Sequence, residues 1–444
     1  MILTLCRGAR KSRMDKNFLQ TFFSSFEPLR QRNFAIYLGG QAISLIGTWL
    51  QATAQGWVVW ELSGSEAALG IVAAFAALPL LFLGPFTGAI ADRFDRRRLL
   101  IATQATAMLL AFILAFLVQT KMVQLWHVYV LALVLGVVGA LDFPAQQAFL
   151  GDLSGMQLVR KAVNLNAMIL QVSRILGPAF AGLIINAVGT ATAFWLNGLS
   201  FLAVIASLLL VRSQQVRSHS KNNPLQDFGV ALNFLRTQPR LQDILALVVF
   251  VTFFGLSVLN IMPAVASHTL GGDAQTLGLL LAASGAGALI SVIFVLPYVQ
   301  AARRTGLVLA SAVIWMGIWI LVFSQMRSLS FAMATILLYS IGAPAVIATS
   351  LGLSQMMAPQ DMRARMVSLF VMVSFGLQPV SSLYVGYMAE WLGVPATIFL
   401  NGIMLVLGGA SMLVLRPALR TWSANAAHEN TQKISSESSA TIGH

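Results

Sequence analysis

Twelve long apolar runs, almost free of charged side chains, limit what this chain can fold into more than any other feature. They lie at residues 34–58, 67–91, 99–119, 125–149, 162–187, 191–211, 242–266, 276–300, 306–325, 329–354, 365–390 and 395–415. A helix needs about 20 apolar residues to cross a bilayer, so each run is long enough to span. In lipid the backbone must satisfy its own hydrogen bonds, and the alternation typical of a barrel strand is absent. The runs therefore predict an all-α membrane protein with twelve transmembrane helices.

Composition excludes other classes of protein. Only 10% of the 444 residues are charged, whereas a typical soluble domain carries about 25% charged residues. The single Cys6 has no partner within the chain, which excludes a disulfide-stapled secreted domain. The sequence has no Gly-Lys-Ser/Thr phosphate loop, no Cys/His metal spacing and no Ser/His/Asp set. We therefore expect neither an ATP-driven pump nor an enzyme, and no cofactor or metal ion.

The positive charges indicate how the helices are oriented. Of the 28 Lys and Arg residues, 25 lie in the two tails and the even-numbered connections between runs. Lys121 and Arg327 lie in odd-numbered connections, and Arg174 lies inside a run. Because positive residues concentrate on the cytoplasmic side, both termini are predicted to be cytoplasmic, in the cell inner membrane. The net charge of +13 then follows from topology, and we expect no nucleic-acid partner.

Runs and loops divide the chain into five parts. Leu225, Phe228, Leu232 and Leu235 follow Pro224 at helical spacing, which indicates an amphipathic helix between the sixth and seventh runs, although a disordered tether is the alternative. Phe18, Phe22, Phe26 and Leu29 have similar spacing before the first run. The predicted parts are a basic tail with an interfacial segment (1–33), an N-terminal six-helix bundle (34–211), a cytoplasmic linker with an amphipathic helix (212–241), a C-terminal six-helix bundle (242–416) and a disordered cytoplasmic tail (417–444).

The two halves of the chain resemble each other. Residues 182–198 read GLIINAVGTATAFWLNG, and residues 386–402 read GYMAEWLGVPATIFLNG, with both glycine positions and the Leu-Asn-Gly end in register at an offset of 204. Leu69-Gly70 pairs with Leu277-Gly278 at an offset of 208. Chance similarity between apolar helices is the alternative. We interpret the matches as two pseudo-symmetric six-helix bundles, the arrangement that alternating access uses.

The connection between the second and third runs carries the most specific motif. It reads Gly88-Ala-Ile-Ala-Asp92-Arg93-Phe-Asp95-Arg96-Arg97-Arg98. The stretch resembles the signature of the major facilitator superfamily, Gly-x-x-x-Asp-Arg/Lys-x-Gly-Arg-Lys/Arg, in the position between helices 2 and 3 where that family has it. Asp95 replaces the second glycine of the signature.

Four other stretches narrow the resemblance. They are Asn33-Phe34 to Trp49, the segment LDFPAQQAF at 141–149, Arg174-Ile-Leu-Gly177-Pro178, and RARMVS at 363–368. Together they are similar to the branch that contains enterobactin exporters and drug-efflux proteins, of the transmembrane secretion effector type. The resemblance covers roughly residues 30–416. Gln146 departs from it, because that branch often has Arg there.

The resemblance implies a conformational latch at the cytoplasmic face. Gly88 would let two helices approach closely, and Asp92 would meet the positive N-terminus of a helix in the other half, expected to be helix 11. Arg93, Arg96 and Arg97 would hold phosphate headgroups or carboxylates. A plain positively charged loop is the alternative. With Asp142, the latch residues are Gly88, Asp92, Arg93, Arg96, Arg97 and Asp142.

Asp142 and Arg174 are the charged residues buried furthest inside the predicted helices. A charge at the bilayer centre costs about 2.5–3.5 kcal/mol on insertion scales, so pairing or water access is expected. We favour a pair between Arg96 and Asp142, as the resemblance suggests, with Arg174 facing a central cavity. An Arg174–Asp142 pair and a purely structural role are the alternatives. Arg174, Gly177 and Pro178 also resemble the export-associated motif of helix 5, where the proline removes a backbone hydrogen bond.

A polar face runs along the first helix and indicates a substrate cavity. Its side chains are three or four residues apart, and in lipid they are expected to look inward. Hydrogen bonds between helices are the alternative for any one of them. The predicted lining suits large, weakly charged or amphipathic solutes better than simple sugars or fixed-charge anions. The predicted lining residues are Gln41, Ser44, Thr48, Gln51, Gln55, Arg174, Asn260 and Gln378.

Together these observations predict a secondary active transporter. It would export a siderophore or an amphipathic drug-like molecule by alternating access, in exchange for protons. A lipid flippase of the same fold and a non-transporting assembly or signalling protein are the alternatives. The expected partners are the small-molecule substrate, the proton, membrane lipids and an outer-membrane efflux channel, and the chain is expected to be a monomer.

Overall fold

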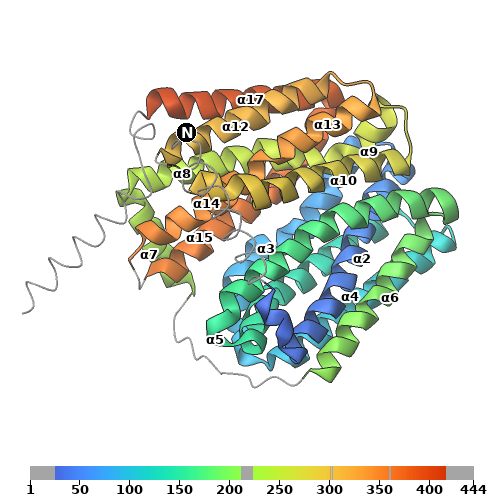
Figure 1. The fold of residues 1–444 in the computed structure, drawn as a ribbon. Helices are drawn as coiled ribbons and strands as arrows, with labels where there is room; N and C mark the ends of the chain where they lie inside the picture. Colours follow the sequence, from blue (N-terminus) through green and yellow to red (C-terminus); the bar gives the residue numbers. More distant parts are fainter. Residues whose placement is uncertain (1–25, 212–223, 301, 303, 360–361, 417–444) are drawn as a thin grey trace, which may run out of the picture.

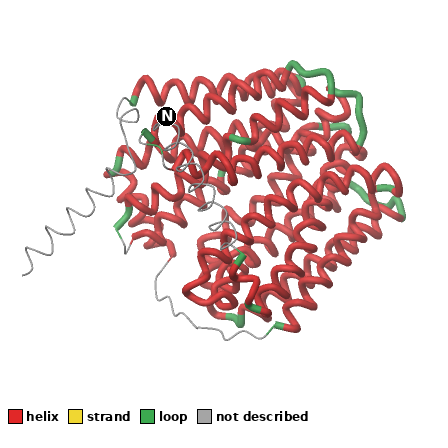
Figure 2. Tube along the Cα trace, viewed as in Figure 1, coloured by secondary structure: helices red, strands yellow, loops and turns green. Residues whose placement is uncertain are grey.

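The described part of the chain is helical almost throughout. The computed structural model describes residues 26–211, 224–300, 302, 304–359 and 362–416 (Figure 1). These residues contain no strand, and short loops join the helices at two opposite ends of the molecule (Figure 2). The predicted tail residues Phe18 and Phe22 and the predicted C-terminal tail 417–444 lie outside the described residues.

The first half of the chain forms a bundle in which two of the helices start at side-chain caps. The side chain of Ser65 accepts the amide of Ala68 at the start of one helix, and that of Asp95 accepts the amide of Arg98 at the start of the next. The elements of this first half are η1 Glu27–Arg30, α2 Arg32–Ser63, α3 Glu66–Arg93, α4 Arg96–Gln119, α5 Leu125–Val188 and α6 Thr190–Leu210.

The loop predicted between the fourth and fifth runs is wrong. Residues 150–161 are helical within α5, and the only interruption described there is Gly155, with φ of 71° and ψ of 163°. A side chain would disfavour this positive φ, so glycine lets the chain turn within one residue. Two candidate spans, Leu125–Gly155 and Gln157–Val188, therefore lie on either side of Gly155.

The second half has more interruptions than the first. Helix α7, Pro224–Thr237, occupies the predicted linker, and Pro263, Pro344 and Pro379 lie near later breaks. The remaining elements are α8 Pro239–Phe250, η2 Val251–Gly255, η3 Leu256–Ile261, α9 Met262–Ala264, η4 Val265–Thr269, α10 Ala274–Ile290, η5 Ser291–Val295, α11 Leu296–Gln300, α12 Thr305–Ser324, α13 Leu329–Ser340, α14 Gly342–Met357, α15 Arg363–Gly376, α16 Gln378–Leu392 and α17 Val394–Leu415.

Eleven stretches of the described chain are long and apolar enough to cross a membrane. Helix α2 is not among them, although its 32 residues include only Arg32 and Glu61 as charged side chains. Because α2 is long enough to span and carries few charges, the polar face predicted along it must lower its mean hydropathy below that of the other spans. Helix α2 packs against α5 and α6 and completes the predicted set of twelve.

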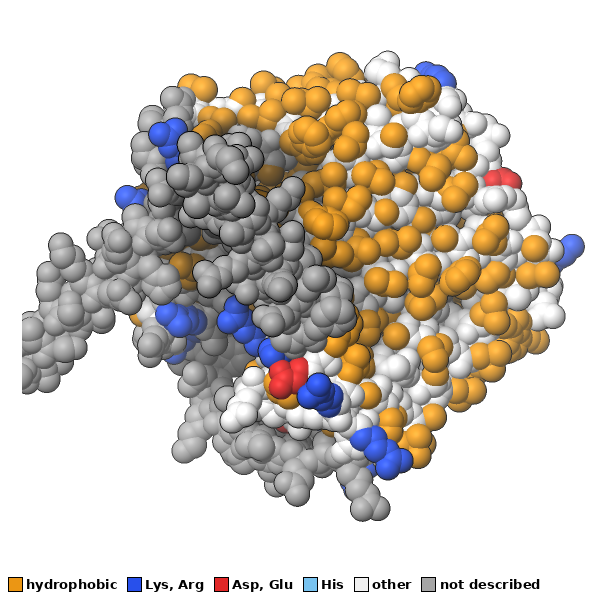
Figure 3. Space-filling view, viewed as in Figure 1, with side chains coloured by type: hydrophobic (Ala, Val, Ile, Leu, Met, Phe, Trp, Pro, Cys, Tyr) orange, Lys and Arg blue, Asp and Glu red, His pale blue; other side chains and the backbone are white. Residues whose placement is uncertain are grey.

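The outer surface is suited to contact with lipid. Hydrophobic side chains spread over much of the visible face, and Lys and Arg lie mainly along its left and lower edges (Figure 3). Large apolar side chains such as Leu210, Phe331 and Trp391 are exposed. An apolar surface of this extent is what acyl chains cover in a membrane protein.

Two close helix crossings join the halves. Helices α2–α6 gather in one half and α8–α17 in the other, with α5 against α10 and α3 against α16 (Figure 1). A methyl group on Gly70 of α3 would lie 2.5 Å from the carbonyl oxygen of Ser382 and 3.1 Å from the Cα of Gly386. A methyl group on Gly278 of α10 would likewise meet the carbonyl oxygen of Pro178 and lie 3.1 Å from the Cα of Gly182.

The two crossings are copies of each other. Gly278 follows Gly70 at the offset of 208 seen in the sequence, and Ser382 and Gly386 follow Pro178 and Gly182 at the offset of 204. Backbone contact through small residues is the usual way in which membrane helices approach closely. The internal repeat therefore has a physical counterpart in the packing between the halves.

We predict that valine at either crossing separates the halves. Gly70→Val or Gly278→Val should lower the free energy of unfolding by about 1–3 kcal/mol, because a side chain there is forced into backbone atoms. Thermal unfolding of the purified chain in detergent measures the effect. Gly39→Val is the matched control, because a methyl group on Gly39 meets nothing within 4 Å. Equal melting temperatures for the three variants would contradict the packing described.

Candidate functional site

The positively charged loop between α3 and α4 is bound mainly within the first half. Asp95, which replaces the glycine of the family signature, caps α4. Arg97 donates from Nε to the carbonyl of Leu208 at 2.5 Å and from Nη2 to that of Leu209 at 2.7 Å. A cation at these last carbonyls of α6 is favoured by the helix dipole. Arg97 thus ties α4 to α6.

Arg96 forms the best-defined ion pair of this region, and its partner is not the predicted one. Its Nη1 donates to both carboxylate oxygens of Asp152, at 2.8 and 2.9 Å. The two side chains are only 10% and 8% exposed. The sequence interpretation favours Asp142 as the partner, and this pairing is not the one formed. Asp152 lies ten residues later on α5, about 15 Å further along the helix, which brings it level with the start of α4.

Asp142 has neutral hydrogen-bond partners instead. Its Oδ1 accepts from Thr103 at 2.5 Å and from Gln104 at 3.0 Å, both on α4, and its Oδ2 accepts from Gln146 at 3.4 Å. Gln146 is the residue that departs from the family pattern. A partly buried carboxylate with three neutral donors is satisfied without a counter-charge, which leaves it able to take up a proton.

The helix-5 motif lies where α5 meets helices of both halves. A methyl group on Gly177 would lie 2.9 Å from the carbonyl oxygen of Ile46 on α2, and the carbonyl oxygen of Pro178 faces Gly278 on α10. One turn earlier, the guanidinium of Arg174 lies over the ring of Trp49, 5.1 Å from its centroid. The alternative Arg174–Asp142 pair does not form, because Arg174 is within 4 Å of no described carboxylate.

Some side chains on the polar face of α2 are buried between helices, and others are exposed. Gln41, Ser44 and Gln51 are buried, and Gln51 accepts a hydrogen bond of 2.7 Å from Asn197 on α6. Thr48 is exposed and donates to the carbonyl of Ser44. Gln55 is partly buried. For Gln51 the structure thus favours a hydrogen bond between helices.

The two lining residues predicted in the second half lie in different surroundings. Asn260, in η3, donates a 2.8 Å hydrogen bond to Ser382 on α16. Gln378 is exposed at the start of α16. Gly88, Asp92 and Arg93 of the predicted latch belong to the last turns of α3, and their side chains lie outside the described residues.

The described polar contacts between the halves gather at the end of the bundle where the odd-numbered loops lie, hereafter the arginine-poor end. Oε2 of Glu390, on α16, accepts from the hydroxyl of Ser65 at 2.7 Å and from the amide of Ala67 at 3.0 Å. His268 lies 3.5 Å from Glu66, with its ring against that of Trp60. The other half thereby supplies a carboxylate to the N-terminus of α3, where the helix dipole favours it.

An equivalent contact holds the N-terminus of α10. Asp273 caps α10 by accepting the amide of Thr276, and it also accepts a 2.6 Å hydrogen bond from Asn186 at the end of α5. This bond from Asn186 lowers the pKa of Asp273 below its ordinary value, since it favours the charged form. Asn186 and Glu390 are 204 residues apart, and Ser65 and Asp273 are 208 apart. The repeat offsets therefore extend to polar contacts that the sequence interpretation missed.

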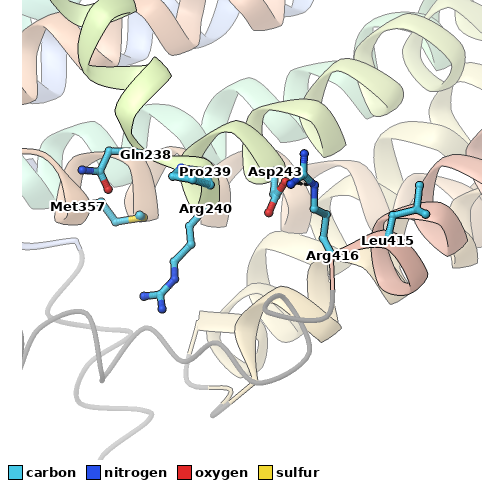
Figure 4. Close-up of a pocket in the computed structure, with 7 residues that line it drawn as sticks. All are labelled: Gln238, Pro239, Arg240, Asp243, Met357, Leu415 and Arg416. Atoms are coloured by element: carbon cyan, nitrogen blue, oxygen red, sulfur yellow. Dashed lines mark ion pairs between the residues drawn. The ribbon is translucent and has the colours of Figure 1, made fainter.

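A separate pocket of about 430 Å³ lies at the opposite, arginine-rich end of the second half (Figure 4). Asp243 and Arg416 approach to 3.3 Å at its wall. All of its lining comes from the start of α8 and the ends of α14 and α17, so it is not shared between the halves. The lining residues are Gln238, Pro239, Arg240, Asp243, Met357, Leu415 and Arg416.

Comparison with known proteins identifies the family. The family model of the transmembrane secretion effectors matches residues 23–441, so the chain belongs to this family of major facilitator superfamily transporters. These proteins are transporters rather than enzymes.

Relatives and solved structures agree with this family. The Staphyloferrin A transporter of Staphylococcus aureus is 23% identical over 372 residues, covering 83% of this chain and 92% of that protein. The multidrug efflux pump Tap of Mycobacterium tuberculosis is 24% identical, with 82% and 88% covered. An inward-facing bacterial homologue of the human lysosomal transporter Spinster superposes with a TM-score of 0.70 at 13% identity, with 89% and 99% covered. The nucleoside transporter NupG superposes with a TM-score of 0.69 at 11% identity, with 87% of this chain and 98% of that chain covered.

We predict that Arg96 and Asp152 act as one unit. Arg96→Gln or Asp152→Asn alone should lower the free energy of unfolding by about 3–5 kcal/mol, because each leaves an uncompensated buried charge. The double variant should lose less than the sum of the two single losses. Thermal or denaturant unfolding of all four proteins measures the coupling. Exposed Lys161→Gln, which breaks the surface pair with Glu27, is the control and should change little. Additive losses for the Arg96 and Asp152 variants would contradict the pairing.

Proposed function

We propose that the chain is a secondary transporter of the inner membrane that exports a small molecule by alternating access. The observation that carries this proposal is the pair of equivalent crossings, α3 with α16 and α5 with α10, whose polar contacts cluster at one end of the molecule. Two bundles joined through small residues can tilt without repacking their own cores.

The proposed substrate is a siderophore or an amphipathic drug-like compound. Support comes from relatives whose names describe a siderophore transporter and a multidrug efflux pump. A cluster of aromatic side chains in the second half fits such a compound: Phe253 and Phe254 lie with their ring centroids 5.2 and 5.8 Å from that of Tyr384. Stacked and edge-on rings bind amphipathic molecules through both surface burial and ring geometry.

In the proposed orientation the arginine-rich end and both termini face the cytoplasm. The distribution of Lys and Arg supports this orientation. The polar contacts at the arginine-poor end would then close the protein toward the outside. Export requires these contacts to open after substrate has entered from the cytoplasm.

The proposed cytoplasmic latch forms when the outer contacts open. Asp92 would meet the N-terminus of a helix of the second half, with Gly88 permitting close approach and Arg93 facing headgroups. Arg96 and Arg97 support this latch indirectly, since they hold the start of α4 on Asp152 and on the end of α6. They are therefore positioning residues in our account.

Proton exchange is proposed to depend on Asp142. It is a membrane carboxylate with neutral neighbours only, so its charge can change without breaking an ion pair. A proton taken up there would weaken the bonds from Thr103 and Gln104, because a protonated carboxyl is a poorer acceptor. The change would loosen α4 from α5 during the transport cycle.

We predict that Asp142→Asn abolishes the coupling of transport to protons but leaves the exchange of substrate across the membrane intact. In proteoliposomes holding the amphipathic dye rhodamine B, an imposed pH gradient should drive uphill dye transport by the wild type, and the variant should lose about tenfold or more of it. Exchange of dye across the membrane without a gradient should persist. Dye fluorescence gives both rates.

Two further variants control for side effects of this change. Asp142→Glu keeps the carboxyl group and should retain part of the gradient-driven rate. Gln146→Ala removes a neighbouring donor but no titratable group, and it should remain coupled. Wild-type uphill transport in Asp142→Asn would rule out Asp142 as the coupling residue, and absence of any dye movement by the wild type would count against the export proposal itself.

A further inference from the structure

Arg174 occupies an unusual place for a positive charge. It lies near the middle of the candidate span Gln157–Val188, where a charge is most costly. Its backbone carbonyl packs close to Gly285 of α10, in the second half, and its side chain lies over Trp49 of α2, in the first half. Arg174 is therefore at the interface between the two bundles rather than on the lipid-facing surface.

The charge of Arg174 is not neutralised by the described residues. The ring of Trp49 attracts the guanidinium but carries no negative charge, and no described Asp or Glu lies within 4 Å. Arg96 shows the contrast, because its buried guanidinium is paired with Asp152 through two hydrogen bonds. A charge kept unpaired in the membrane centre marks a functional site more often than a structural one.

A second polar group near Arg174 also lacks a partner. Tyr339, on α13 of the second half, is 1% exposed, and its hydroxyl makes no hydrogen bond to the described residues. Helix α10 links the two positions: Ser284 shares a 2.8 Å hydrogen bond with Ser340, the residue after Tyr339, and the adjacent Gly285 packs against the carbonyl of Arg174. The π-helical segment η2 packs closely on this hydroxyl, because a methyl group on Gly255 would lie only 3.3 Å from it.

The repeat indicates that the fold does not require this cation. At the offset of 204 the counterpart of Arg174 is Gln378, a neutral residue, whereas Pro178, Gly182 and Asn186 correspond to residues that make equivalent contacts. Of the two positions related by the repeat, only the one in the first half therefore carries a positive charge. The asymmetry suits a ligand with one anionic group.

We propose that Arg174, Trp49 and Tyr339 form a subsite for an anionic group of the substrate, a carboxylate or a similar planar oxyanion. The guanidinium can donate two parallel hydrogen bonds to such a group, and the hydroxyl of Tyr339 can donate a third. The apolar part of the substrate lies along Trp49. The inference rests on the proposed transport function and replaces the expected preference for weakly charged solutes with one for amphipathic acids.

The subsite links substrate charge to movement of the halves. Arg174 and Trp49 belong to the first half and Tyr339 to the second, so a bound anion would be held from both sides. A bound anion would neutralise Arg174 and so lower the free-energy cost of its charge in the middle of the membrane. An uncharged analogue of the substrate lacks this effect.

Binding of two matched dyes tests the proposal. Rhodamine B carries a free carboxylate, and its methyl ester does not. Fluorescence anisotropy with the full chain in lipid nanodiscs should show that the wild type binds the acid about tenfold more tightly than Arg174→Gln does. Affinity for the ester should be equal in the two proteins within about twofold. Arg174→Lys should recover part of the loss, and Tyr339→Phe should weaken binding of the acid alone.

Arg327→Gln is the matched control, because it removes the same charge from an exposed loop at the arginine-poor end. Unchanged binding of the acid by Arg174→Gln, or an equal loss for acid and ester, would overturn the subsite. If Arg174→Gln does not fold, Arg174→Lys and Tyr339→Phe decide by the same acid-to-ester ratio. Because this readout is binding, the subsite can stand when no dye is exported, and it can fail when transport is intact.

Discussion

Close contact between backbones at two equivalent helix crossings is the constraint on which the rest of the structure depends. Gly70 and Gly278 bring α3 onto α16 and α5 onto α10, and no side chain intervenes at either point. Lipid offers no hydrophobic force between helices, so dispersion contact and hydrogen bonds must hold the halves together. The polar contacts of Glu390 and Asn186 lie at the same end as these crossings and add to them. The arrangement places the backbone and polar contacts between the halves together at one end of the molecule.

Charges within the membrane divide into three kinds. Arg96 forms an ion pair with Asp152 and fixes the start of α4, and Asp142 is satisfied by neutral donors that permit a change of protonation. Arg174 has only an aromatic ring as its partner. An ion pair lowers the free-energy cost of a charge, but it also prevents that charge from binding a proton or a ligand. We therefore connect Asp142 with proton exchange and Arg174 with substrate binding, because neither has a charged partner.

Sequence reasoning predicted the fold well because hydropathy acts over whole helices. It failed at single contacts. The Arg96–Asp142 pair was wrong because its partner depends on how far α4 lies along α5, which apolar periodicity does not set. The loop at 150–161 was also wrong, since one glycine can replace a loop. Glu390 and Asn186 could have been found from the repeat offset, whereas Arg174 over Trp49 required the helix packing.

Cross-linking across the outer interface tests the central claim most directly. In a Cys6→Ser background, Ser65→Cys with Glu390→Cys, or Asn186→Cys with Asp273→Cys, can be joined by a short, cleavable bifunctional thiol reagent. Gln119→Cys with Trp195→Cys, whose native side chains are hydrogen-bonded within the first half, serves as the control pair. The account predicts that either link between halves stops dye transport until the linker is cleaved, while the control pair continues to transport. Undiminished transport with the α3–α16 and α5–α10 interfaces linked would contradict it.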